Sequence, residues 1–399
     1  MKSKLSESPF SKNRERPFVY AAFGKSAYEN TRKALSLFDL SPVCGKRVLL
    51  KPNAGRVAPP GSGVVTDPQV VAAAIDAFRE AGAAETAVGE SPITGVNTME
   101  AFEVSGIASV AASRNCPLID MDELPSVETD VPEGKAINSL KVCAPVFDYD
   151  IVVSIPVMKT HMHTGVTLSV KNMKGCLWRR SKVLLHMLPP VKGNSEKPIN
   201  IAIADVSGIL RPHLSIIDGM TGMEGLGPSA GFPKALNTVI VSADAFAADA
   251  VACKLMGLDA ENIDHLRLGA ERGYGTINID NIEIEPGNWK DFISPFEKPP
   301  ENLSIQFPNI NVLDKSSCSA CQSTLLLFLK KYAGKLSDYF PKNEAVNIAI
   351  GKGHDDVPLN TLCVGNCTSK HKNKGIFVPG CPPVGSEILN VLSKSKTKE

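Results

Sequence analysis

Five of the ten cysteines are concentrated near the carboxyl end of the 399-residue chain. They are Cys318, Cys321, Cys363, Cys367 and Cys381. In a reducing compartment such crowding indicates a metal site more often than a set of disulfides. Thiolates are soft ligands, and a group of cysteines without clustered histidines suits an iron–sulfur cluster or Zn²⁺. We expect the other five, scattered cysteines to be small core residues.

The spacing of the late cysteines favours an iron–sulfur cluster over zinc. Cys318 and Cys321 form a C-x-x-C motif, whereas Cys367 and Cys381 are isolated and 14 positions apart. Zinc sites usually combine two closely spaced ligand pairs, such as a C-x-x-C motif with a second C-x-x-C or H-x-H motif. Cys363 lies inside an apolar run, so we expect it in the core. We therefore predict a [4Fe–4S] cluster bound by Cys318, Cys321, Cys367 and Cys381. Three alternatives remain. The cluster could be bound by only three thiolates, Cys363 could be the ligand in place of Cys367, or all of these thiols could be structural.

A second group of chemistry-bearing residues lies between positions 157 and 175. Lys159, His161 and His163 alternate, so an extended chain would direct all three to one side. If the chain then becomes helical, Lys171 and Lys174 share a face with Thr167. Converging cations and imidazoles suit a carboxylate or phosphate, and His161 is the best candidate for a general acid or base. A metal-binding H-x-H pair or a hydrogen-bonded surface turn would explain the same pattern.

Further polar residues follow predicted strands, at the sheet edge where open α/β folds bind ligands. Lys51 and Asn53 end the strand at 48–50, and Asp218 follows the strand at 214–217. Asp218 could also be a helix or turn cap. Glu224 is flanked by glycines and a proline, with little structural reason to be there. The candidate catalytic residues are His161, Lys159 and Glu224. The candidate substrate-binding residues are Lys51, Asn53, His163, Lys171, Asn172 and Asp218.

Charge and hydropathy exclude several classes of protein. The 43 Lys and Arg residues balance 42 Asp and Glu, a net charge of +1, which argues against nucleic-acid binding and a polybasic membrane surface. No run of about 18 apolar residues indicates a spanning helix, and the polar start is not a secretory signal. We therefore expect a cytoplasmic protein. Neither a G-x-G-x-x-G loop after the first strand nor a P-loop motif supports a nucleotide cofactor.

The candidate residues have to be positioned by alternating strands and helices. A strand at 48–50, a helix opened by Thr66-Asp67-Pro68 and a strand at 86–89 form a βαβ unit. Later segments fit the same scheme: strands at 151–155, 214–217 and 238–241, and a helix at 245–256. We predict an α/β fold with a mostly parallel sheet and helices on both faces.

Four segments are expected along the chain. They are a flexible tail (1–16), a large α/β domain with the polar pocket (17–285), a linker (286–304) and a small α/β iron–sulfur domain (305–399). The small domain is expected to contain helices at 325–332 and 386–393 and strands at 346–350, 359–364 and 376–378.

Several ordered blocks resemble the family catalogued as domain of unknown function 362. The blocks are Lys51-Pro52-Asn53, Thr66-Asp67-Pro68, Lys159-Thr160-His161, Lys171-Asn172-Met173-Lys174-Gly175, Asp218-Gly219-Met220 and the stretch 223–228. The resemblance covers roughly residues 45–285. It implies an α/β fold and, in members with a suitable cysteine-bearing module, a [4Fe–4S] cluster, but no particular reaction. Many members carry ferredoxin-type cysteine runs. Here the cysteines are dispersed, and the P-G-C-P-P turn is similar to turns in the cluster-bearing small subunits of hydrogenases and of respiratory complex I.

These observations together predict an iron–sulfur protein, with a redox enzyme acting on a small anionic organic substrate as the leading hypothesis. A protein such as ferredoxin would be the electron partner. One alternative is an electron carrier without substrate chemistry. The other is a non-redox lyase or racemase in which the cluster is structural or acts as a Lewis acid.

Overall fold

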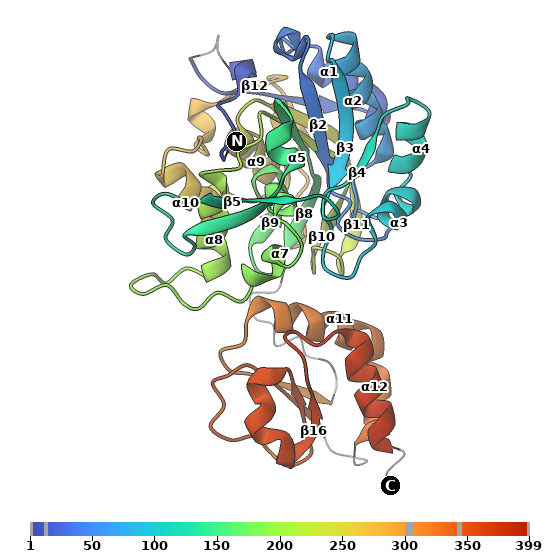
Figure 1. Cartoon of the computed structure of the whole chain (residues 1–399), viewed down its shortest axis with the longest axis vertical. Coiled ribbons are helices and arrows are strands. Elements are labelled where there is room, and N and C mark those ends of the chain that lie inside the picture. The colour runs from blue at the N-terminus through green and yellow to red at the C-terminus, as the bar shows by residue number, and fades with distance from the viewer. Residues whose placement is uncertain (1–2, 12–14, 300–306, 308, 341–344, 397–399) are drawn as a thin grey trace. The chain divides into compact units, whose positions relative to one another are not determined.

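The computed structural model describes residues 3–11, 15–299, 307, 309–340 and 345–396, and the chain forms two compact units. Met1–Leu185 and Pro189–Pro299 make up the large unit, and His186–Leu188 and Pro300–Glu399 make up the small unit. Each unit has its own sheet and its own hydrophobic core (Figure 1).

The large unit is an α/β structure, as predicted. Its strands are β1 (Phe18–Phe23), β2 (Arg47–Pro52), β3 (Glu85–Glu90), β4 (Leu118–Asp120), β5 (Ser126–Asp130), β6 (Ser139–Cys143), β7 (Ile151–Ile155), β8 (Val157–His161), β9 (Gly165–Thr167), β10 (Leu214–Glu224), β11 (Phe232–Ser242) and β12 (Glu283–Glu285). Its helices are α1 (Ala27–Leu35), α2 (Pro68–Glu80), α3 (Thr98–Val104), α4 (Ile107–Ala112), α5 (Pro145–Asp148), α6 (Ser169–Asn172), α7 (Ser181–Leu184), α8 (Pro198–Ser207), α9 (Ala245–Leu255) and α10 (Asp264–Glu271).

The main sheet is mixed but mostly parallel. In the described part of the chain its order is β12-β1-β11-β10-β7-β2-β3-β4, and the β8–β9 hairpin joins it through β10. The run from β10 through β7, β2 and β3 to β4 is parallel, whereas β11 is antiparallel to both of its neighbours. Parallel strands end at one edge of a sheet, so β2, β3 and β7 bring their last residues together.

Helices cover both faces of this sheet. Helices α1 and α2 pack on one face, against alternate strand residues such as Val48, Leu50 and Val153. Helix α9 packs against β10 and β11 from the other face. Helix α2 begins as its sequence predicts, because the Asp67 side chain accepts a hydrogen bond from the Gln69 N–H and Pro68 is the first helical residue.

Strand β10 is longer than predicted. The expected strand at 214–217 continues to Glu224, so Asp218 and Glu224 lie within the strand instead of after it. The pairing of β10 with β11 shifts in register between Gly219 and Thr221. In the sequence, a glycine after an apolar run looks like the end of a strand. Here Gly219 lies at an irregularity inside the strand, which explains why the predicted strand was too short.

The segment expected to be a flexible tail contacts the large unit over its described residues. Leu5 is buried, and its N–H donates to the Ile209 carbonyl at 3.0 Å. The hydroxyl of Ser6 is 2.9 Å from Nε2 of His213. Residues 1–2 and 12–14 lie outside the described residues.

The expected linker at 286–304 has its first part in the large unit. Trp289 and Phe296 are buried, and the Phe296 N–H donates to the Met256 carbonyl at 2.9 Å. These two aromatic side chains give a proline-rich stretch enough apolar surface to pack. Residues 300–304 lie outside the described part of the chain.

The small unit is a parallel sheet with two helices on one face. Its elements are β13 (Ile310–Asp314), α11 (Ser319–Leu336), β14 (Val346–Ile350), β15 (Thr361–Val364), the 3₁₀ helix η8 (Asn366–Lys374), β16 (Gly375–Val378) and α12 (Gly385–Lys396). The described strands pair in the order β13-β14-β15-β16, all parallel. Helix α11 starts six residues earlier than predicted, so the C-x-x-C motif lies at its amino end. Strand β15 starts two residues later, because Leu359 is 70% exposed in the preceding turn.

Candidate functional site

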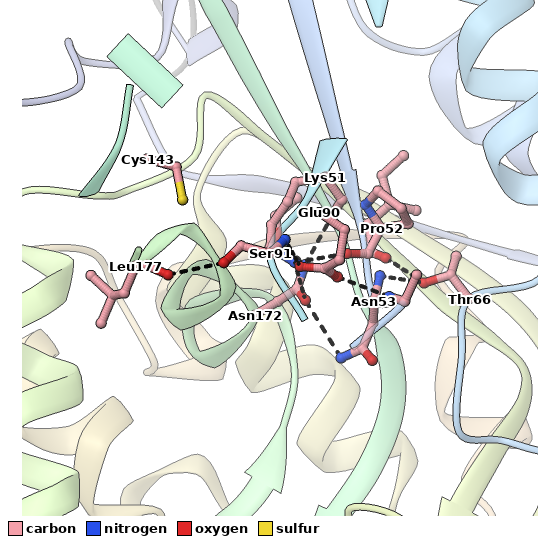
Figure 2. Close-up of polar contacts among 12 residues, drawn as sticks. Lys51, Pro52, Asn53, Thr66, Glu90, Ser91, Cys143, Asn172 and Leu177 are labelled. Carbon is pink, nitrogen blue, oxygen red and sulfur yellow. Dashed lines mark hydrogen bonds and ion pairs between the residues drawn. The ribbon is translucent and has the colours of Figure 1, made fainter. Parts of the chain in front are cut away.

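A buried ion pair joins the ends of β2 and β3. Lys51 Nζ is 2.7 Å from Glu90 Oε1, and the two side chains are 1% and 2% exposed. The Glu90 carboxylate also accepts hydrogen bonds from the backbone N–H groups of Ala54 and Ser91, each at 2.9 Å. Figure 2 shows Glu90 beside Lys51 and Ser91. Buried charges are tolerated when they are paired and fully hydrogen-bonded. The positive charge of Lys51, which was expected to bind a substrate, is therefore neutralised by Glu90 inside the protein.

Asn172 connects this ion pair to helix α6. Its Nδ2 donates to the Lys51 carbonyl and to the Ser154 hydroxyl, both at 3.1 Å, and its Oδ1 accepts from Lys51 Nζ at 3.3 Å. Asn53 Nδ2 lies 3.5 Å from the same oxygen (Figure 2). Gly175 leaves room for the pair, because a Cβ there would lie 2.7 Å from Lys51 Nζ. The predicted residues Lys51, Asn53 and Asn172 are thus brought together.

Lys159 lies beside this network on the β8–β9 hairpin. The register places it directly opposite Thr167. Its Nζ donates to the Val64 carbonyl at 2.6 Å and to Asn53 Oδ1 at 3.3 Å. Neither partner is a carboxylate, so Lys159 is hydrogen-bonded but its charge is not neutralised by them.

Lys171 and Lys174 add two further ammonium groups to this region. Lys171 Nζ donates to the Thr167 hydroxyl at 3.3 Å. Burial lowers the pKa of Lys171 to about 7 and lowers the pKa of Lys174 well below its ordinary value. Burial likewise lowers the pKa of Lys159, and the nearby charges of Lys171 and Arg56 lower it further. A bound anion would stabilise the charged forms of these groups.

The two histidines of the H-x-H motif are buried neighbours. The backbone N–H of His163 donates to Nδ1 of His161 at 3.1 Å, and the ring centroids are 5.8 Å apart. With Nδ1 as an acceptor, a neutral His161 ring carries its proton on Nε2. His161 shares a face of β8 with Lys159, as predicted. His163 lies after the strand in the turn, so the alternation does not extend to it.

Helix α6, which carries Lys171 and Asn172, is held in place by a carboxylate from α9. Asp249 accepts hydrogen bonds from the N–H groups of Ser169 at 2.7 Å and Val170 at 2.9 Å. Burial raises the pKa of Asp249 to about 8, although these N–H donors oppose the shift. Asp249 is therefore a positioning residue for the lysine-bearing helix.

Asp218 has structural partners. It accepts hydrogen bonds from the N–H groups of Asp67 at 2.7 Å and Met220 at 2.9 Å, as in the turn-cap alternative. Burial raises its pKa to about 7.

Glu224 also has a structural reason to be where it is. It accepts from the Glu297 N–H at 3.0 Å and lies 3.2 Å from Lys234 Nζ. The premise that no structural contact requires an acid at position 224 is therefore wrong.

The four predicted ligand cysteines of the small unit lie near one another. The C-x-x-C motif is at the amino end of α11, where Cys321 Sγ is 3.3 Å from the position a Cβ would take on Gly365. The segments of Cys367 and Cys381 are joined by two hydrogen bonds between Asn366 and Gly380, at 2.9 and 2.8 Å.

Charges within this group perturb one another. A hydrogen bond from Cys321 lowers the pKa of Cys318 to about 6. The same bond and burial raise the pKa of Cys321, and the charges of Cys318, Cys367 and Cys381 raise it further. The Cys321 thiol is thus within electrostatic reach of the other three cysteines of the predicted ligand set.

Cys363 is separate from this group. It is fully buried beside Ala349 and Val357, and its Sγ points to the His371 carbonyl at 3.7 Å. Among the described residues, no group of three or more His, Cys, Asp or Glu side chains is placed to hold a metal ion. Four cysteine thiols are soft donors, the type of ligand that both an iron–sulfur cluster and a zinc ion take.

Glu90 is the functional-site residue that sequence reasoning missed. It ends β3 in the same way that Lys51 and Pro52 end β2, and the two strands are neighbours. Opposite charges at the ends of two successive parallel strands were the available signal. Recognising it required the strand order, which the βαβ pattern from 48 to 89 already implied.

Comparison with known proteins identifies the segment that carries this lysine network. Residues 48–254 match the family described as Domain of unknown function (DUF362). The chain belongs to the DUF362 family. This confirms the resemblance seen in the sequence blocks. The DUF362 match includes the Lys51–Glu90 pair, the β8–β9 hairpin and α6, and it ends before the small unit, so it does not bear on the cysteines.

The DUF362 member is also similar to a curated protein. It is 32% identical over 225 residues to the Thylakoid-associated protein sll1697 of Synechocystis sp.. The alignment covers 55% of this chain and 65% of that protein, so the chain spans less than two thirds of its relative's length. In the part of the DUF362 chain that the structure describes, no helix has both the length and the apolar character needed to cross a bilayer.

Two solved structures align with part of this chain. The lactate racemase apoprotein from Thermoanaerobacterium thermosaccharolyticum has a TM-score of 0.37 at 11% identity, over 63% of this chain and 62% of its own. A protein from Thermotoga maritima, solved by crystallography, has a TM-score of 0.33 at 15% identity, over 62% of this chain and 60% of its own.

Proposed function

We propose that this DUF362 protein is an iron–sulfur oxidoreductase acting on a small organic anion. The small unit would hold a [4Fe–4S] cluster through Cys318, Cys321, Cys367 and Cys381. The large unit would bind the anion at the lysines of the β8–β9 hairpin and α6. A ferredoxin-like electron partner and a cytoplasmic location belong to the same proposal.

The grouping of the four thiols is the observation that carries this proposal. Cys318 and Cys381 are 63 positions apart in the sequence, yet both influence the pKa of Cys321. Structural thiols have no need to converge, and Cys363 is an example that does not. A cluster bound by four thiolates supplies one-electron transfer, with its irons closed to direct substrate binding.

The lysines support the anionic nature of the substrate. Lys159 and Lys171 donate to neutral oxygen atoms, and both have lowered pKa values. In the described part of the chain, neither the buried Lys159 nor the half-buried Lys171 forms an ion pair with a carboxylate, and a purely electron-carrying protein has no need for such cations. An anion placed beside them would supply the missing negative charge, and His161 would be available to give or take a proton.

One observation favours a second candidate function, proton transfer without net redox chemistry. Burial lowers the pKa of Lys171 to about 7, the range in which a lysine can accept a proton at neutral pH. In that case the cluster would have a structural role. The two candidates differ in one respect, since only the redox enzyme needs an electron donor or acceptor for turnover.

Cysteine variants purified without oxygen test the cluster proposal. Replacing Cys318, Cys321, Cys367 or Cys381 by Ser, one at a time, is expected to lower bound iron to less than half of the wild-type amount. Cys363→Ser is the matched control and is expected to keep its iron. Retention of iron by all four variants would refute the proposed ligand set. If Cys363→Ser loses its iron and Cys367→Ser keeps it, Cys363 is the ligand in place of Cys367.

A further inference from the structure

His265 is a buried imidazole whose polar atoms are not satisfied. The residue is fully buried, and neither Nδ1 nor Nε2 has a hydrogen-bond partner among the residues that the structure describes. A neutral imidazole carries one donor and one acceptor, and nearly all buried polar groups in folded proteins are paired. An orphaned ring of this kind requires a partner that is not part of the described chain.

The other fully buried histidine of the large unit outside the H-x-H motif shows the usual situation. His213 accepts from the Val152 N–H through Nδ1 at 2.9 Å, and its Nε2 is 2.9 Å from the Ser6 hydroxyl. Both of its ring nitrogens are therefore used within the fold. Burial alone therefore does not explain why the ring nitrogens of His265 lack partners among the described residues.

The backbone around His265 is fixed by contacts on both sides. Ile263 packs on the start of β9, where its Cδ1 is 2.6 Å from the position a Cβ would take on Gly165. Asp264 accepts a hydrogen bond from Asn200 Nδ2 of α8 at 2.6 Å. The Ile263 contact holds the start of α10 against the β8–β9 hairpin, and the Asp264 contact holds it against α8.

The start of α10, which carries His265, lies beside the lysine group, because Ile263 packs on Gly165 of β9 and the Thr167 hydroxyl of β9 accepts from Lys171 Nζ at 3.3 Å. Burial lowers the pKa of His265 to about 3, and the positive charge of Lys171 contributes to that shift. The ring is neutral at physiological pH. It can donate one N–H to a ligand without adding a further charge to the lysines.

We infer that His265 is an additional binding residue of the anion site, where its orphaned ring donates a hydrogen bond to a carboxylate or phosphate oxygen held by Lys171. This inference rests on the anion-binding part of the proposed function. His265 lies outside the sequence blocks that supplied the other residues of the candidate site. It also sets the ligand chemistry, since the bound group must offer an oxygen to both an ammonium and an imidazole N–H.

Thermal unfolding and calorimetric titration of the full chain with inorganic phosphate and with malonate, at constant ionic strength, test this inference. His265→Met removes the donor, and His265→Gln keeps an N–H of similar reach. His265→Met is expected to unfold at the same temperature as the wild type or higher, because no internal partner is lost. Its affinity for the better of the two anions is expected to fall at least tenfold, with His265→Gln in between.

Two comparison variants separate the possible failures. Lys171→Met removes the cation, and His213→Gln is the control for a histidine with internal partners, expected to lower the unfolding temperature and leave anion affinity unchanged. If His265→Met unfolds at a lower temperature and binds the anions like wild type, while Lys171→Met does not bind them, His265 is structural and the inference is wrong. If wild type binds neither phosphate nor malonate, the anion site of the proposed function fails as well.

Discussion

Lys51 is fully buried and Lys171 is half-buried in the large unit, and their charges have different partners. Lys51 is paired with Glu90 at 2.7 Å. Lys171 has a hydroxyl partner, and burial lowers its pKa to about 7. At the residue scale the first lysine is thus part of the scaffold, and the second is a charge that a ligand or a change of pH can alter.

The affinity of the large unit for a small anion is expected to depend on the protonation of Lys171. Its pKa is lowered, so it is charged below pH 7 and mostly neutral at pH 8. Affinity is therefore expected to be roughly tenfold weaker at pH 8 than at pH 6. Lys171 influences the pKa of Lys159, Lys174 and His265, and Asp249, whose pKa burial raises to about 8, holds the helix that carries Lys171.

Calorimetry in two buffers of different ionisation enthalpy measures this linkage. At pH 8 the wild type is expected to take up close to one proton when it binds malonate, which does not itself titrate near pH 8, and Lys171→Met is expected to take up none. Equal affinities at the two pH values, with no proton uptake, would contradict the role given to Lys171.

The Lys51–Glu90 pair is expected to contribute to stability in a way that an exposed pair does not. Glu90→Gln leaves a buried ammonium without its counter-charge and is expected to cost about 3–5 kcal/mol of unfolding free energy. The same two strands offer a matched control in the exposed Arg47–Glu85 pair, whose N–O distance is 2.9 Å. Glu85→Gln is expected to cost about 1 kcal/mol or less. Urea unfolding measures both, and similar costs for the two variants would refute the distinction.

At the element scale, the site depends on a short helix that cannot hold itself in place. Helix α6 has four residues, and its first N–H groups are satisfied by Asp249 of α9. A helix of this length has almost no intrinsic stability, so its position comes from such contacts. Asp249 therefore controls where Lys171 and Asn172 lie, although it lies outside the segment from 157 to 175 that was predicted to bind the substrate.

Asp249→Ala is expected to weaken anion binding without removing any group that touches the anion. Loss of the carboxylate leaves the N–H groups of Ser169 and Val170 without their acceptor and lets α6 shift. We expect at least a fivefold loss of affinity together with a loss of about 1 kcal/mol of stability. The control is Asn97→Ala, which removes the cap of α3, where the Asn97 side chain accepts from the Glu100 N–H. That variant is expected to lose similar stability with unchanged affinity. Unchanged affinity in both variants would contradict the positioning role.

The elements that could be predicted from the sequence are those whose pattern is local. The apolar run at 346–350 is β14 with the same bounds, and the Thr-Asp-Pro signal opens α2. Strand β10 was shortened because Asp218 and Gly219 look like a strand end. The partners of Glu224 and Asp249 depend on contacts across more than 70 positions, and no local pattern encodes those.

At the scale of the whole molecule, two separate cores carry the two halves of the proposed chemistry. The lysine network and His265 are in the large unit, and the four cysteines are in the small unit. A separate small domain was expected from the sequence because five cysteines are concentrated between positions 318 and 381. The neighbouring strands that bring Lys51 to Glu90 follow a local βαβ pattern, whereas the approach of Cys321 to Gly365 depends on tertiary packing.

Unfolding of the full chain is expected to show two transitions, since each unit has its own core. Phosphate or malonate is expected to raise only the large-unit transition. Removal of iron by a chelator is expected to lower only the small-unit transition. Scanning calorimetry measures both, and Cys321→Ser assigns the small-unit transition. A single transition that responds to both treatments would contradict the separation.

The most direct test of the central claim is the iron and sulfide content of the full chain purified without oxygen, with electron paramagnetic resonance spectra before and after dithionite. The account predicts about four irons and four sulfides per chain and a signal that changes on reduction. One zinc per chain without sulfide, or a chain free of metal that keeps its fold and its anion binding, would contradict it.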